Sequence, residues 1–166
     1  MRALSLRRAI LFGWLSVATL DISDAFVFWY LRRGISPGRV LQGVAAGALG
    51  RDAALGGGIG AMILGAAAHL TVAFTVVAVY ALASGRLPAL RRRPFVFGPL
   101  YGVLVYGVMY YGVMPLSRIG WPAFSLVPFL NNVLIAHVCC VGIPTAWWAS
   151  RIGAPPAAED RLSPRA

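Results

Sequence analysis

Four long apolar runs constrain this chain more than any other feature of its sequence. A hydrocarbon layer about 30 Å thick is crossed by about 20 helical residues, and each run is at least that long. Only helices and closed barrels pair all of their backbone groups inside lipid, and the alternating strands that a barrel needs do not occur here. We therefore predict an all-α integral membrane protein, a four-helix up-and-down bundle with spans at residues 9–31, 57–83, 95–116 and 123–149.

The composition supports a membrane location. Hydrophobic residues make up 59% of the 166 residues and charged residues only 12%, whereas a soluble domain carries about 25% charged residues. With so few charged residues, a soluble protein would expose a largely apolar surface to water. This excludes soluble enzymes and secreted disulfide scaffolds. Cys139 and Cys140 are adjacent within an apolar run, so they form no disulfide framework, and we expect them to pack as small side chains.

The positive charge lies in short clusters between the apolar runs. All 15 basic residues are arginine, against five acids, and the formal net charge is +10. Clusters of this kind are typical of topogenic signals and of contacts with anionic lipid headgroups, so we predict no nucleic-acid partner. Ten of the arginines fall on the side of both termini, which predicts that the two ends are cytoplasmic in a bacterial inner membrane.

The domain organisation follows from the same runs. We predict one four-span membrane domain over residues 1–150 and a disordered cytoplasmic tail over residues 151–166, which is rich in Pro and Ala. Ser16-Val17-Ala18 resembles a signal-peptide cleavage site. The apolar run nevertheless resumes after Asp24 and ends only at Arg32, so we expect an uncleaved first span.

A short helix and several glycine pairs are expected to shape the packing. Ser36-Pro37 has the pattern of a helix start, and the apolar residues after it share one side. That helix is too short to span, so we expect an interfacial helix between the first two spans. Three glycine pairs have the spacing that allows close helix approach, and we assign them to packing: Gly43 and Gly47, Gly56 and Gly60, and Gly98 and Gly102.

Ionisable side chains occur at a similar depth in three of the four runs. Asp21, His69 and His137 lie roughly 18 to 21 Å from the start of their runs, at about 1.5 Å per residue. In an up-and-down bundle the first helix neighbours the second and the fourth, so Asp21 is expected to meet one or both imidazoles near the bilayer midplane. Asp24 shares the face of Asp21. Such residues are costly in lipid and normally face the bundle interior.

Other polar residues of the third and fourth runs are weaker candidates for binding. Asn131 and Asn132 precede His137 by six and five residues, which places them on another helix face, and we expect them to form helix–helix hydrogen bonds. Tyr106 belongs to a repeated Tyr-Gly-Val motif at 101, 106 and 111, whose spacing makes the tyrosines spiral around the helix. The Tyr106 hydroxyl is expected to need a polar partner.

The sequence does not favour an enzyme. It contains no HExxH, GxSxG, P-loop or CxxC motif, and two histidines without a thiolate pair do not predict a structural zinc. We assign no cofactor from the pattern. Two histidines at one depth on different helices are also an arrangement that ligates haem iron, so a bis-histidine haem protein remains a third hypothesis.

Several short motifs together resemble a known group of proteins. They are Leu20-Asp21, Ala68-His69-Leu70, Leu100-Tyr101-Gly102-Val103, Met114-Pro115-Leu116-Ser117 and Ala136-His137-Val138-Cys139. In this order they resemble small bacterial four-helix inner-membrane proteins and, more distantly, YagU-type proteins. The resemblance covers residues 16–151. It implies an inner-membrane location and a four-helix fold, and it carries no catalytic residue over to this chain.

These patterns leave two main hypotheses. The first is a polytopic protein in which Asp21, His69 and His137 form a midplane polar site for binding or permeation of protons or a small solute. The alternative is a non-catalytic accessory or scaffold subunit, either a homo-oligomer or part of a membrane complex. In that case the same side chains only fix helix packing.

Overall fold

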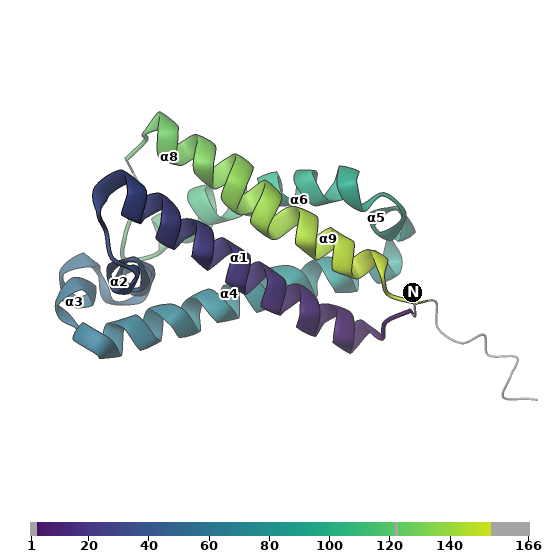
Figure 1. Cartoon of the computed structure of the whole chain (residues 1–166), viewed down its shortest axis with the longest axis horizontal. Coiled ribbons are helices and arrows are strands. Elements are labelled where there is room, and N and C mark those ends of the chain that lie inside the picture. Colours follow the sequence, from purple (N-terminus) through teal and green to yellow (C-terminus); the bar gives the residue numbers. More distant parts are fainter. Residues whose placement is uncertain (1–2, 122, 154–166) are drawn as a thin grey trace, which may run out of the picture.

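The chain folds as a helical bundle in a computed structural model that describes residues 3–121 and 123–153 (Figure 1). The only extended pairing among these residues is an isolated bridge between Leu4 and Ile152. The elements in chain order are α1 (Leu6–Arg33), α2 (Pro37–Leu49), α3 (Arg51–Gly56), α4 (Gly58–Arg86), α5 (Pro88–Arg92), α6 (Pro94–Val108), the π-helix η1 (Met109–Val113), α7 (Met114–Leu116), α8 (Leu126–Leu130), the π-helix η2 (Asn131–Gly142) and α9 (Ile143–Ser150).

Four continuous helical stretches are long and apolar enough to cross a membrane: Leu6–Arg33, Gly58–Arg86, Pro94–Leu116 and Leu126–Ser150. The first packs against the second and the fourth, and the third packs mainly against the fourth. Many large apolar side chains on the outside are exposed, as expected of helices that face lipid rather than water. The predicted all-α membrane bundle is therefore confirmed, and the chain is a polytopic membrane protein.

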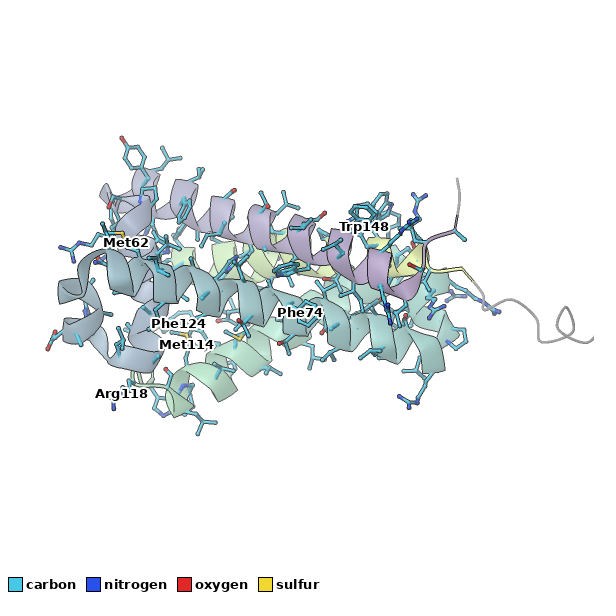
Figure 2. All side chains as sticks on the ribbon, turned by 90° about the horizontal axis from the view of Figure 1, so that it is seen from below. Met62, Phe74, Met114, Arg118, Phe124 and Trp148 are labelled. Carbon is cyan, nitrogen blue, oxygen red and sulfur yellow. The ribbon has the colours of Figure 1, made fainter. Side chains whose placement is uncertain are left out.

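The short helix expected after the first span is α2, which crosses the end of the bundle beside α4 (Figure 1). Contact is close because Gly65 of α4 has no side chain, and a Cβ there would overlap the Leu41 carbonyl. Gln42 is buried and its amide nitrogen donates to the Gly58 carbonyl at 3.3 Å. At the same end, which Figure 2 marks with Arg118, the Arg118 backbone N–H donates to the Gly47 carbonyl at 3.0 Å.

Most of the buried core residues are alanine or valine, which allows the spans to approach closely. The central cluster consists of Val17, Ala18, Ala73, Val77, Val105 and Val141. The predicted packing role of Gly98 and Gly102 is confirmed, because a Cβ at either position would touch the backbone of the fourth span. The same prediction was wrong for Gly43, Gly56 and Gly60, where nothing lies within 4 Å of an added Cβ. Those three glycines face outward, so their spacing reflects the abundance of glycine in the chain.

The two ends of the described chain meet at one end of the bundle. The Leu4 backbone N–H donates to the Arg151 carbonyl at 2.8 Å, and the Gly153 N–H donates to the Leu4 carbonyl at 3.1 Å. An even number of spans requires this arrangement. The predicted disordered tail lies, from residue 154 onward, outside the described residues.

Candidate functional site

Asp21 and His69 come together near the middle of the first two spans. Asp21 Oδ2 in α1 lies 3.7 Å from His69 Nδ1 in α4. The other ring nitrogen of His69, Nε2, is 2.9 Å from the Ala18 carbonyl oxygen, one turn earlier in α1. His69 is therefore held between a backbone carbonyl and a carboxyl group of the same neighbouring helix.

These two contacts define where hydrogens reside on His69. A carbonyl oxygen only accepts, so Nε2 must carry the hydrogen that bonds Ala18. In the neutral ring, Nδ1 is then an acceptor facing Asp21. The pair is attractive when one proton lies between the two groups, either on the carboxyl group or on Nδ1. At 3.7 Å the atoms are too far apart for a direct hydrogen bond, so the interaction in this arrangement is electrostatic.

Asp24 forms a second link, from the first span to the fourth. The Asn131 side-chain nitrogen in η2 donates to Asp24 Oδ2 at 2.9 Å. Asp24 stands three residues after Asp21, so both carboxyl groups lie on one side of α1. The expectation that Asn131 forms a helix–helix hydrogen bond is confirmed.

His137 lies on the π-helical part of the fourth span and contacts the backbone of Asn132. Its Nδ1 lies 2.8 Å from the Asn132 carbonyl oxygen, so Nδ1 carries the hydrogen and Nε2 is the acceptor of the neutral ring. An α-helix would turn residues five apart onto different faces. In a π-helix the backbone pairs residue i with i+5, and this brings the two residues within reach. The Asn132 side chain bonds the Pro128 carbonyl of its own helix at 2.9 Å, so the helix–helix role expected of Asn132 was wrong.

The fourth span brings His137 into the neighbourhood of the carboxyl groups. Asp21 interacts electrostatically with both His137 and His69, and Asp24 interacts with His137. Cys140 also interacts with Asp24 and Asp21. The sequence predicts only a packing role for Cys140, although its position three residues after His137 suggests a related face. Short distances thus join Asp21 to His69 and Asp24 to Asn131, whereas His137 and Cys140 act on the two carboxyl groups through electrostatics alone.

Tyr106 lies beside this cluster on the third span. Its ring meets the His137 ring edge to face, with centroids 5.5 Å apart. The side chain is buried, and its hydroxyl has no hydrogen-bond partner among the described residues. The other two repeat tyrosines differ: Tyr101 donates to the Val76 carbonyl at 2.8 Å, and Tyr111 is exposed. The predicted spiral of the three tyrosines is confirmed.

The site is only partly enclosed by protein. The side chain of His69 is 12% exposed and that of Asp21 is 28% exposed. Asp24, Asn131 and His137 are also intermediate in burial. The two carboxyl groups therefore lie outside the tightly packed core cluster.

The geometry also bears on a metal or haem. Among the described residues, no group of three or more His, Cys, Asp or Glu side chains is placed to hold a metal ion. His69 Nε2 bonds the Ala18 carbonyl, so this nitrogen would have to leave that carbonyl to ligate iron.

No family model, curated protein or solved structure matches this chain. A bundle of four spans supports many activities, so the fold alone does not define the function.

Proposed function

We propose that Asp21, His69 and His137 form a polar site near the bilayer midplane that binds protons and allows them to pass between the spans. The observation that carries this proposal is the 3.7 Å approach of Asp21 Oδ2 to His69 Nδ1, with His69 Nε2 tied to the Ala18 carbonyl. A ring fixed in this way offers one free nitrogen to one carboxyl group. Paired ionisable side chains inside a membrane are characteristic of proton relays.

Two further groups extend the site along the first span. Asp24 is about 4.5 Å farther along the helix axis than Asp21, at 1.5 Å per residue, on the side of α2. His137 interacts electrostatically with both carboxyl groups. Protons arriving from the α2 end would meet Asp24 first, then Asp21 and the two imidazoles. A small polar solute that exchanges hydrogen bonds with the same groups would follow the same order.

Proton flux through reconstituted protein tests this function. The full chain is placed in proteoliposomes that contain a pH-sensitive dye, and a potassium diffusion potential drives protons inward. We expect Asp21→Asn to reduce the flux to that of protein-free vesicles, because the amide cannot exchange a proton with His69. Asp52→Asn is the matched control, because Asp52 is exposed and lies in α3, outside the four spans. Unchanged flux in Asp21→Asn would contradict the proposal.

One observation favours the alternative of an accessory or scaffold subunit. The contacts of the cluster join different spans: His69 bonds Ala18 across the first two, and Asn131 bonds Asp24 across the first and fourth. Interhelical hydrogen bonds of this kind fix helix packing in membrane proteins. A scaffold built in this way would present its outer apolar faces to a second copy or to other subunits of a membrane complex.

The His69→Leu variant separates the two functions. A packing role predicts a lower melting temperature in detergent, because leucine cannot bond the Ala18 carbonyl, together with no proton flux in either protein. A relay predicts that the unmodified protein conducts and that His69→Leu does not, whatever the change in melting temperature. Measurements of flux and melting on the same preparations therefore decide between them.

The membrane and its orientation complete the proposal. We propose a bacterial inner membrane with both termini cytoplasmic, supported by the excess of arginine at the end where the two described termini meet. A fluorescent reporter that matures only in the cytoplasm, fused after residue 166, tests this orientation. Fluorescence is expected, and its absence with a stable fusion would reverse the topology.

A further inference from the structure

An open cleft of about 500 Å³ lies at the end of the bundle where the described termini meet. The start of α1 contributes Ser5 and Leu6 to its walls, and the end of α4 contributes Leu82 and Gly85. Arg91 of α5 closes one side. This cleft is remote from the Asp21–His69 pair, and the proton relay proposed above makes no use of it.

Arg91 has a fixed orientation in the cleft. Its Nε donates to Ser84 Oγ at 3.0 Å, and Ser84 Oγ in turn donates to the Ala81 carbonyl at 2.7 Å. Ser84 is only 1% exposed, so the guanidinium is anchored to a buried hydroxyl. Gly85 has no Cβ, and a Cβ added there would lie 3.6 Å from Arg91 Nη2. The guanidinium has five N–H donors, and the Ser84 bond uses one of them.

The described residues around the cleft carry charge of one sign. Among the described residues the acids are Asp21 and Asp24, within the first span, and Asp52, in α3 at the opposite end of the bundle. The arginines close to the cleft end are Arg7, Arg8, Arg86, Arg91, Arg92, Arg93 and Arg151. Within the part of the chain that the structure describes, these surroundings attract an anion and offer it no competing carboxylate.

The walls of the cleft suit a lipid better than a free ion. Leu6 is 37% exposed and Leu82 is 54% exposed, and both belong to the ends of membrane spans. The ends of spans lie at the level of the headgroups. An anion held by Arg91 therefore has apolar side chains beside it on the membrane side, where a glycerol backbone and acyl chains continue.

We propose that this cleft binds an anionic phospholipid, with its phosphate on Arg91 and its acyl chains against Leu6 and Leu82. Basic pockets between membrane helices bind such headgroups in other membrane proteins. The hydrogen bond that Arg91 donates to Ser84 orients the guanidinium before the lipid arrives, and Gly85 leaves the space that the headgroup occupies. The lipid then bridges α1, α4 and α5 at the end where the chain termini meet.

Native mass spectrometry of the full chain in detergent tests the proposal. The chain is titrated with phosphatidylglycerol and, separately, with phosphatidylcholine that has the same acyl chains. Phosphatidylglycerol is expected to bind more tightly, and Arg91→Gln to weaken its binding roughly tenfold, as for the loss of a charge-assisted hydrogen bond. Arg92→Gln is the charge-matched control, since Arg92 is exposed and does not line the cleft, and its binding should stay close to that of the unmodified chain.

A second variant leaves every charge in place. Gly85→Leu fills the cleft and is expected to weaken phosphatidylglycerol binding, even if Arg91→Gln proves too unstable to purify. Equal losses in Arg91→Gln and Arg92→Gln would overturn the proposal in favour of diffuse charge attraction. Tight binding by Gly85→Leu, equal binding of the two lipids, or displacement of the lipid by inorganic phosphate at similar concentration would overturn it as well.

Discussion

Asn131 in the fourth span donates a 2.9 Å hydrogen bond to Asp24 in the first span. The two residues are far apart in the chain, and their bond joins the π-helix η2 to α1 beside the Asp21–His69 pair. This hydrogen bond orients one carboxyl oxygen of Asp24. It also links the acidic side chains of α1 to the span that carries His137. Packing and the proposed proton site therefore depend on the same interaction.

Replacement of Asn131 is expected to loosen this connection. Asn131→Leu removes the donor to Asp24 and should lower the free energy of unfolding by about 1 kcal/mol, the order measured for interhelical hydrogen bonds in membranes. Thermal unfolding in detergent measures the change. Asn132→Leu is the matched control, because the Asn132 side chain bonds the Pro128 carbonyl of its own helix. An equal loss in the two variants would show that the Asp24 bond adds nothing specific.

The contact between the third and fourth spans yields a prediction about Gly102. A Cβ at this position would overlap the His137 carbonyl, so Gly102→Ala is expected to push the two spans apart and destabilise the protein by about 1–3 kcal/mol. Gly107→Ala on the same span is the control, because nothing lies within 4 Å of its Cβ position. That control should be as stable as the unmodified chain or slightly more stable, because alanine favours helix over glycine. Similar melting temperatures for the two variants would rule out the close packing at Gly102.

The sequence was sufficient to predict the spans and the principal pair of the site. Run length and hydropathy determine the spans because lipid accepts few other backbone conformations. The pairing of Asp21 with His69 followed from equal depth in antiparallel neighbours. These predictions depend on spacing along straight helices, which the sequence shows directly.

The local departures from the α-helix could not be predicted from the sequence. The contact of His137 with Asn132 requires the five-residue spacing of a π-helix, and no composition pattern signals a π-helix. The packing glycines were also only partly identifiable. Gly65 packs closely against the Leu41 carbonyl, yet it belongs to none of the three predicted glycine pairs. Which glycine meets a neighbour depends on how each helix is rotated, and that is decided by the whole bundle.

The haem hypothesis leads to a prediction about the visible spectrum. His69 Nε2 is engaged with the Ala18 carbonyl, so we expect the protein purified from cells with sufficient haem to show no Soret band. Addition of hemin to the purified protein should likewise give no shifted band beyond that of hemin in the same detergent. A Soret band that disappears in His69→Leu would instead establish histidine ligation and displace the proton site as the role of this residue.

Tyr106 provides a prediction that separates packing from participation in the site. Its hydroxyl is buried without a partner among the described residues, and an unsatisfied buried polar group costs about 1–3 kcal/mol. Tyr106→Phe should therefore keep the ring contact with His137 and raise the melting temperature. Tyr111→Phe is the control, because Tyr111 is exposed and its replacement should change stability little.

Proton flux tests whether the Tyr106 hydroxyl also takes part in the site. If the hydroxyl takes part in proton transfer beside His137, Tyr106→Phe reduces proton flux in proteoliposomes and Tyr111→Phe does not. A lower melting temperature in Tyr106→Phe, with flux unchanged, would contradict both expectations, since it would mean that the hydroxyl bonds a group that holds the bundle together.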